Sequence, residues 1–301
     1  MSITAFLVAA ALAPLFVGIV NKTKAFFAGR RGSGFFQLYF DLAKLMRKSC
    51  PRSTTTTWVF DLAPSIALAA TVVAGAIFPW CPSPEDTPFP AVSAVLFFYL
   101  LGTGRFFTVL GAMDTGSAFE GMGASRESLY SALAEPVVFT VLGFLVLLTS
   151  TTSLSGMLGG YDASAWSRHS MSIVLAAAAF FAALLSECSR VPFDDPETHL
   201  ELTMIHEAMI LDNAGPDLAF ILYGSALKFE LLAAFLVSML LPEIPIGGAL
   251  RFLLVMAGVA AVAMSVGVVE STMARMRFVR TPQAMSGALM LAALAVILFV
   301  I

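Results

Sequence analysis

Eight long apolar segments constrain this chain more than any other feature of its sequence. An α-helix needs about 20 mostly apolar residues to cross the hydrocarbon core of a membrane. The segments that approach this length are Ile3–Val20, Trp58–Trp80, Val92–Met113, Pro136–Leu158, Met171–Glu187, Leu218–Leu241, Gly248–Ser271 and Ala284–Ile301. The sequence therefore predicts an all-α, polytopic membrane protein in which residues 1–301 form a single membrane domain.

The composition indicates that lipid is the solvent for most of this chain. Apolar residues make up 58% of the 301 residues and charged residues only 12%, and the mean hydropathy is +0.88. A soluble domain carries about 25% charged residues, so this chain has too few polar groups to cover a surface in water. A net charge of −3 argues against a nucleic-acid partner. The three cysteines are widely separated and predict no disulfide framework, zinc site or iron–sulfur site.

The distribution of basic residues predicts how the chain is oriented. Lys and Arg are retained on the cytoplasmic side of a membrane during insertion. Thirteen of the 17 lie in odd-numbered loops between the predicted helices, and only Arg168 and Arg251 lie in even-numbered ones. We therefore expect cytoplasmic odd-numbered loops and both termini outside, although the first loop supplies most of the bias. The apolar N-terminus has no basic region or clear cleavage site, so we expect a retained helix.

The segment 34–48 in the first loop has a different pattern. Its apolar residues recur at helical spacing and its charged residues fill the other positions. It is too short and too charged to span a membrane, so it predicts an amphipathic helix on the cytoplasmic surface. A simple surface anchor and a docking element for a partner are equally compatible with this pattern.

The most acidic part of the chain is the predicted cytoplasmic loop 187–217. It holds eight of the chain's 20 acidic residues, together with Arg190, His199 and His206. Pro192 and Pro196 prevent a straight helix here. Carboxylates next to apolar sequence have raised pKa values and can form a proton relay, whereas a solvated acidic loop is the plain alternative.

Charged residues also occur at or inside the predicted helices. Arg105 and Lys228 lie within helices, and Glu230 follows Lys228 by two positions and so faces another side. We expect each to need a partner on another helix, as a functional group or as a structural ion pair. Glu135 and Glu270 lie near predicted helix ends, where they could simply extend toward water.

The two histidines of the acidic loop do not have the spacing of a metal site. His199 and His206 are seven residues apart, whereas zinc-binding helices use pairs four apart with further ligands. Hydrogen-bonded interface residues or proton carriers are the better interpretation. The sequence contains no convincing nucleotide-binding glycine motif and no support for a nucleophilic triad.

The string from Glu187 to Glu197, ECSRVPFDDPE, resembles the E-x-x-R-x-P-F-D-x-P-E loop of the complex I subunit that adjoins the quinone chamber. The resemblance extends over nearly the whole chain and includes the surface helix, residues 60–64 (FDLAP), and a third cytoplasmic loop that ends at Glu135. It implies an eight-helix core with an outside N-terminus and a long acidic loop after the fifth helix.

Two longer strings resemble a second branch of this superfamily. Complex I subunits usually carry another carboxylate between the positions that match Glu197 and Glu201, and this chain has Thr198-His199-Leu200 there. The run 195–209 (DPETHLELTMIHEAM), with AMDTGS at 112–117 and GASRE at 123–127, is similar to the membrane subunit of formate hydrogenlyase-type, energy-converting [NiFe] hydrogenases. In that branch no quinone is reduced, so the corresponding cavity would be filled or vestigial.

The resemblance implies a non-catalytic subunit of an oxidoreductase complex in the cytoplasmic (inner) membrane of a prokaryote. Its partners would be hydrogenase large and small subunits, a ferredoxin-like Fe–S subunit and antiporter-like membrane subunits. The [NiFe] centre and the Fe–S clusters would lie in those partners, and this chain would hold no cofactor. A redox change at the nearest cluster would alter the electric field at the acidic loop and load or eject a proton.

This hypothesis assigns roles to three groups of residues. The acids expected to relay ions, H⁺ or Na⁺, are Glu135, Glu187, Asp194, Glu197, Glu201, Glu207, Asp212 and Glu270. The cations expected to balance them are Arg105, Arg190 and Lys228. The residues expected to dock the peripheral arm are Arg126, Pro192, Phe193, His199 and His206. Three alternatives stay open: the quinone-chamber subunit of a complex I-like oxidoreductase, a stand-alone secondary transporter, and a passive anchor.

Overall fold

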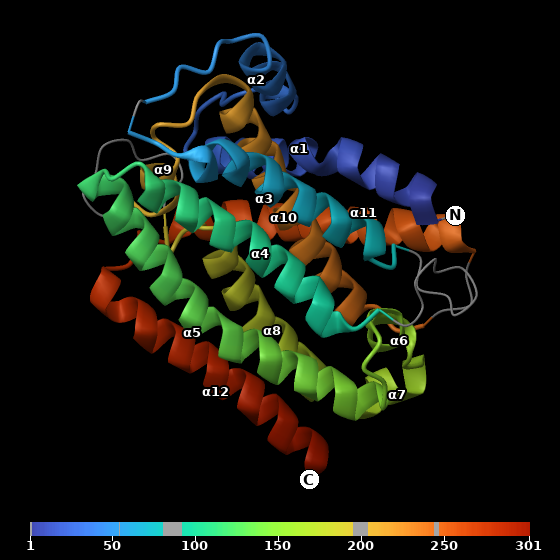
Figure 1. The fold of residues 1–301 in the computed structure, drawn as a ribbon. Helices are drawn as coiled ribbons and strands as arrows, with labels where there is room; N and C mark the ends of the chain where they lie inside the picture. Colours follow the sequence, from blue (N-terminus) through green and yellow to red (C-terminus); the bar gives the residue numbers. More distant parts are fainter. Residues whose placement is uncertain (1, 54, 81–91, 195–203, 244–246) are drawn as a thin grey trace.

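The computed structural model describes residues 2–53, 55–80, 92–194, 204–243 and 247–301, and helices dominate it (Figure 1). In chain order the elements are α1 (Ser2–Phe27), α2 (Gln37–Leu45), α3 (Trp58–Ile77), α4 (Ala94–Asp114), α5 (Ala118–Thr149), α6 (Leu154–Gly159), α7 (Ala163–Arg168), α8 (Ser170–Glu187), α9 (His206–Met209), α10 (Gly215–Leu240), α11 (Gly248–Thr272), the 3-10 helix η1 (Phe278–Arg280) and α12 (Thr281–Val300). Within these ranges, eight helices are long and apolar enough to cross a membrane. The predicted polytopic all-α fold is confirmed.

Helix α10 is the central element of the bundle. It packs against α1, α3, α8 and α11, and 72% of its most apolar stretch is buried inside the protein. The outer helix α12 packs on α5 and α8, and only 22% of its corresponding stretch is buried. An apolar exterior of this kind suits lipid, where exposed apolar side chains cost nothing, whereas polar groups must find partners inside.

An aromatic cluster joins α10 to two neighbouring helices. The ring of Phe235 on α10 lies 4.9 Å from that of Phe180 on α8 and 5.2 Å from that of Phe98 on α4, measured between centroids. Aromatic pairs at such distances stabilise beyond the burial of their area alone. The cluster therefore holds α4, α8 and α10 in fixed relation, and these helices carry the charged residues described below.

The fourth predicted span is wrong at both ends. Helix α5 begins at Ala118 and not at Pro136, so Arg126 and Glu135 lie on a helix and not in a cytoplasmic loop. Proline is tolerated inside a membrane helix when neighbouring elements satisfy the backbone, and buried polar contacts along 118–135 hold this polar half in place. The helix ends at Thr149 because Ser150 has a left-handed backbone (φ 55°), so the rest of the predicted span belongs to α6.

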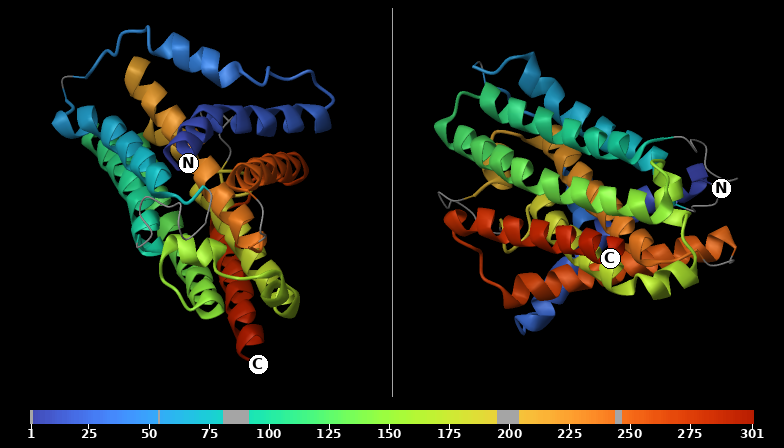
Figure 2. Two further views of the ribbon diagram at one scale, coloured as in Figure 1. Left: turned by 90° about the vertical axis from the view of Figure 1, so that its right-hand side faces the viewer. Right: turned by 90° about the horizontal axis from the view of Figure 1, so that it is seen from below.

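The short elements gather at the two ends of the bundle. Helices α2 and α9 lie toward one end, and α6, α7 and both chain termini lie toward the other (Figures 1 and 2). Within the segment 34–48, α2 covers Gln37–Leu45 and packs on α1 and α10. The described parts of the acidic loop 187–217, called the acidic segment below, lie at the end that carries α2 and α9. Residues 195–203, which include the candidates Glu197, His199 and Glu201, lie outside the described ranges.

Candidate functional site

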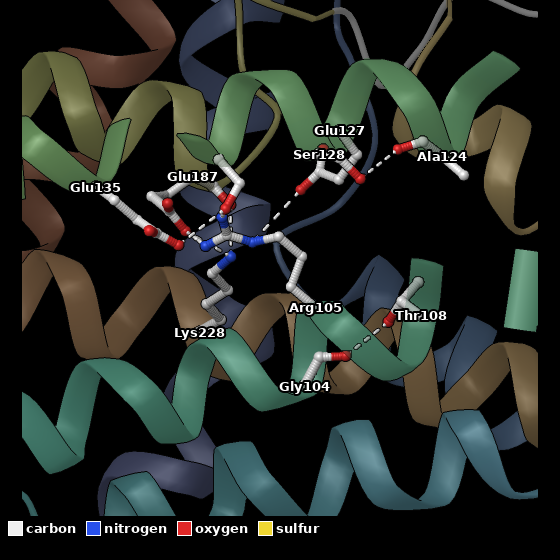
Figure 3. Close-up of polar contacts among 10 residues, drawn as sticks. Gly104, Arg105, Thr108, Ala124, Glu127, Ser128, Glu135, Glu187 and Lys228 are labelled. Atoms are coloured by element: carbon white, nitrogen blue, oxygen red, sulfur yellow. Dashed lines mark hydrogen bonds and ion pairs between the residues drawn. The ribbon is translucent and has the colours of Figure 1, made fainter. Parts of the chain in front are cut away.

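A buried guanidinium is the centre of a charge network between transmembrane helices (Figure 3). Arg105 lies in the middle of α4 and is 12% exposed. Its guanidinium forms an ion pair with Glu187 at the end of α8, donates to the hydroxyl of Ser131 on α5, and places Nε 3.7 Å from Oε1 of Glu127 on α5. A buried charge is tolerated only with such partners, so Arg105 depends on α5 and α8.

Lys228 enters the same network from α10. Its Nζ lies 3.0 Å from Oε2 of Glu187 and donates to the backbone carbonyl of Glu187 at 2.7 Å. The last carbonyls of a helix lack partners within that helix, so Lys228 also caps α8. With every member ionised, Arg105 and Lys228 balance Glu127 and Glu187. We call these four residues the Arg105 network.

Close packing of two helices places Arg105. A Cβ added to Gly104 would lie 3.2 Å from the carbonyl oxygen of Ala67, so the missing side chain lets α4 approach α3. Consecutive helical residues point about 100° apart, and Arg105 accordingly extends from α4 toward α5 and the end of α8 (Figure 3).

A second buried network surrounds Glu270 on α11. The side chain of Glu270 is 0% exposed and lies between Lys24 of α1 and Arg190, with N–O distances of 3.2 Å and 3.4 Å. The guanidinium of Arg190 also lies 5.6 Å from the ring centroid of Phe229, a cation–π contact. Glu270 is therefore an interior ion-pair partner and does not extend toward water.

Asp194 organises the chain that follows α8. Its Oδ1 lies 2.8 Å from Nη2 of Arg275, and its Oδ2 accepts backbone N–H groups of Ile205 (3.3 Å) and His206 (3.0 Å). One buried carboxylate thus ties residue 194 of the acidic segment to residues 205 and 206 and to the chain between α11 and α12. Such charge-assisted bonds are stronger than neutral ones.

A cavity of about 300 Å³ connects the two networks. Apolar residues of α1, α3 and α10 form much of its wall, and Arg105, Glu127, Glu187, Lys228 and Arg190 contribute its charged part. The described residues leave this space open, and the expectation of a filled or vestigial cavity in the hydrogenase branch stays a prediction. Its wall offers both an apolar surface and a group of fixed charges.

His206 and Glu207 also line this cavity. Burial lowers the pKa of His206 to about 4, and the charges of Lys228 and Arg190 act in the same direction. The imidazole is therefore neutral at neutral pH. Burial raises the pKa of the neighbouring Cys188 thiol to about 11, so this thiol is not a nucleophile near neutral pH.

The remaining candidates fall into two groups. Pro192 and Phe193 are buried within this chain, and the ring of Phe193 lies edge-on to Tyr130 at 6.4 Å. Arg126 donates to the carbonyl of Met204 at 3.2 Å. These three residues hold the acidic segment against α5, so any contact with a partner would be made by the loop surface that they support.

Two acidic candidates are exposed. Glu135 lies beside the Arg105 network, where its carboxylate accepts a hydrogen bond from Ser131 at 3.3 Å (Figure 3). Asp212 has an exposed side chain, and its backbone N–H donates to Glu120 of α5 at 3.1 Å. The hydroxyl of Ser131 thus joins Glu135 to Arg105, whereas Asp212 marks the contact between the acidic segment and α5.

Sequence reasoning missed Glu127 as a site residue. The glutamate is 6% exposed and faces Arg105, but we placed 115–135 in a cytoplasmic loop, where a glutamate needs no partner. The spacing of Glu120, Glu127 and Ser131 at seven and four residues could have revealed one face of a helix. In the described part of the chain, no three His, Cys, Asp or Glu side chains lie where they could hold a metal ion.

Comparisons with known proteins agree with this architecture. The whole chain, residues 1–301, matches the family described as NADH dehydrogenase. Hydrogenase-4 component C of Escherichia coli K12 is 31% identical over 274 residues, which cover 89% of this chain and 85% of the relative. Formate hydrogenlyase subunit 4 of the same organism is 29% identical and is covered over 91% of its length, against 92% of this chain.

A solved structure shares the fold. A chain in the structure of the membrane-bound sulfane sulfur reductase, an archaeal respiratory membrane complex, superposes with a TM-score of 0.84 at 18% identity. The match covers 99% of this chain and 97% of that chain. At this identity the likeness concerns the fold alone.

Proposed function

We propose that this chain, which belongs to the NADH dehydrogenase family, is the membrane coupling subunit of a hydrogenase-type complex. The observation that carries the proposal is the Arg105 network: four charged residues from four helices, paired with one another and largely shielded from solvent at the wall of a cavity. Two relatives, named as hydrogenase-4 component C and formate hydrogenlyase subunit 4, align over about nine-tenths of the chain, which favours this branch over a quinone-reducing one.

The network offers a physical means of coupling. Glu127 and Glu187 share one guanidinium, so a displacement of Arg105 toward one carboxylate weakens the counter-charge of the other. A buried carboxylate that loses its counter-charge binds a proton, because the charged form is no longer stabilised. Ion binding would thus follow the position of Arg105, and Ser131 and Glu135 would connect the network to the surface of α5.

The signal for such a displacement would come from the acidic segment. Asp194 joins two parts of this segment through the N–H groups of Ile205 and His206, and Arg190 lies four residues before Asp194 in the Glu270 network. A peripheral arm that binds to this segment would change the electric field at these residues when its redox state changes. The field would be screened little, because the surroundings have a low dielectric constant. Glu197, Glu201 and His199 would take part from the same segment.

The proposal includes the setting of the chain. It would lie in the cytoplasmic (inner) membrane of a prokaryote, with α2 and α9 at the cytoplasmic end and both termini outside, as the excess of Lys and Arg in the first loop favours. The [NiFe] centre and the Fe–S clusters would belong to the hydrogenase large and small subunits and a ferredoxin-like subunit. Antiporter-like subunits would contact the membrane helices and receive the ion.

One purification tests the identity of the complex. The complex is isolated through a tag on this chain in mild detergent, its subunits are identified by mass, and nickel and hydrogen turnover are assayed. Nickel together with hydrogen evolution or uptake is the expected result. A nickel-free complex that reduces quinone would assign the chain to the complex I branch, and its cavity would then be a quinone path. A chain that purifies alone would contradict the proposal.

A double substitution tests the relay. Glu187→Gln with Glu201→Gln removes one acid of the Arg105 network and one of the acidic segment. We expect hydrogen turnover to continue and ion translocation to stop. Unchanged translocation per hydrogen would reject the relay, and a proportionate loss of assembly alone would support a passive anchor.

A further inference from the structure

Glu230 is a buried carboxyl group outside both networks, and it lies on the face of α10 opposite to Lys228. Glu230 is 0% exposed, and neither of its oxygen atoms has a hydrogen-bond partner among the described residues. It follows Lys228 by two positions, which places it about 200° around the helix from the lysine that enters the cavity. Glu230 does not line the cavity. It therefore cannot be an accessory member of the Arg105 network.

The face that carries Glu230 packs near an interruption in α1. Tyr223 lies two helical turns before Glu230 on the same face, and its hydroxyl donates to the carbonyl of Ala10 at 2.9 Å. In a regular helix that carbonyl would accept from residue 14, which here is Pro14 and has no N–H. Tyr39 of α2 donates to the next carbonyl, that of Ala11. A polar, partly exposed site thus exists where α1, α2 and α10 meet.

Glu230 lies within electrostatic range of the polar site formed by Tyr39 and Tyr223. Burial raises the pKa of Tyr39, and the charge of Glu230 adds to that increase, so the two groups lie within electrostatic range. Charged side chains of the helices packed on α10 have partners elsewhere: Lys24 pairs with Glu270, Glu187 with Lys228 and Arg105, and Asp61 with Arg52. Lys22 donates to the carbonyl of Arg31, Arg251 donates to that of Leu158, and Asp41 accepts from Gln37, whereas Lys44 of α2 is exposed. The phenols of Tyr39 and Tyr223 lie within electrostatic range of Glu230, and both are neutral at neutral pH.

These observations favour the protonated form of Glu230 over the ionised form. In the part of the chain that the structure describes, an ionised carboxylate here would have neither a hydrogen-bond donor nor a cation to stabilise it. A carboxylic acid needs far less stabilisation, because it carries no charge. We propose that Glu230 is a membrane-embedded proton-binding site, occupied at rest and separate from the Arg105 network. Proton binding stands without the proposed function, whereas a part for Glu230 in translocation rests on it.

Infrared spectroscopy of the assembled complex tests the proposal directly. A protonated carboxyl group has a carbonyl band that ionised carboxylates lack, and exchange into heavy water shifts that band. We expect the difference spectrum between the wild type and Glu230→Gln to contain one such band, shifted in heavy water. Glu243→Gln removes an exposed carboxylate as the matched control, and its difference spectrum should show only a loss of ionised carboxylate.

Other results would overturn the proposal that Glu230 binds a proton. An ionised-carboxylate signal lost in Glu230→Gln, or a band that heavy water does not shift, would show that Glu230 does not exchange a proton. A band that disappears on addition of sodium would make the site a metal-ion site. If Glu230→Gln fails to assemble, Glu230→Asp keeps the acid, and its band should appear at a changed frequency. These readouts do not depend on hydrogen turnover, so they can fail or succeed independently of the proposed function.

Discussion

Lys228 binds Glu187 at two points, with its Nζ 3.0 Å from the carboxylate Oε2 and 2.7 Å from the backbone carbonyl of the same residue. One side chain of α10 therefore both neutralises a buried charge and completes the C-terminal end of α8. The acidic segment begins at this end, so the contact joins the membrane interior to the region where a peripheral arm would be seated.

Removal of the Lys228 charge should lower the thermal stability of the complex unless its partner Glu187 is also neutralised. Lys228→Met leaves Glu187 with only Arg105, and breaking a buried pair costs about 3–5 kcal/mol. We expect a clear loss of thermal stability of the complex and recovery of much of it in the Lys228→Met, Glu187→Gln double variant. Thermal unfolding of the purified complexes measures both. Equal losses in the single and double variants would show that the pair is not energetically coupled.

Glu127→Gln should separate ion translocation from electron transfer. The amide fills the same space, and Arg105 keeps its ion pair with Glu187, so the fold should tolerate the change. We expect hydrogen turnover close to that of the wild type and a large fall in ions translocated per hydrogen. Glu120→Gln is the matched control, because Glu120 is also buried on α5 but contacts the N–H of Asp212 and not Arg105. Equal effects of both variants would count against the assignment.

The position of the acidic segment against α5 should depend on Gly123, where the two approach closely. A Cβ at Gly123 would lie 2.9 Å from the carbonyl oxygen of Ile205 and 3.0 Å from the Cβ of Ala208, whereas one at Gly121 meets nothing within 4 Å. Alanine in place of helical glycine stabilises by up to about 1 kcal/mol. We expect Gly121→Ala to be neutral or stabilising and Gly123→Ala to reduce co-purification of the peripheral arm. Equal recovery of the arm in both variants would mean that the contact is unimportant for docking.

Stability should decrease in mild acid because of His206. Its pKa in the folded protein, about 4, lies below the ordinary value of 6.5, so the folded state binds fewer protons between these values. The contribution is complete above pH 6.5 and is lost as the pH falls toward 4, by roughly 3 kcal/mol. His206→Gln should flatten this part of the stability profile, measured by thermal unfolding at a series of pH values. A profile as steep as that of the wild type would assign the acid sensitivity to other groups.

The membrane spans could be predicted from the sequence because the length of an apolar run is a local property. Seven of the eight runs match helices closely, and the exception is α5, whose first half is polar. There, buried partners on other elements replace the apolar side chains that usually identify a span. Glu127 is such a case, since its partner Arg105 belongs to another helix.

The pairing of charges could not be predicted in the same way. The sequence shows that Arg105 and Lys228 need partners, but not that both meet at Glu187, because the distance between helices depends on packing. Arg190 stands three residues from Glu187 in the chain yet pairs with Glu270 of α11, 80 positions away. Only the arrangement of the helices separates these neighbours into two networks.

The most direct test is the number of protons translocated per hydrogen molecule in proteoliposomes that contain the complex with Lys228→Met and Glu187→Gln together. This double variant keeps the network neutral while it removes Glu187, one of the two carboxylates that share the guanidinium of Arg105. We expect hydrogen turnover to persist and proton translocation to be abolished. Translocation at the wild-type ratio would show that ions do not depend on the Arg105 network and would contradict its role in coupling.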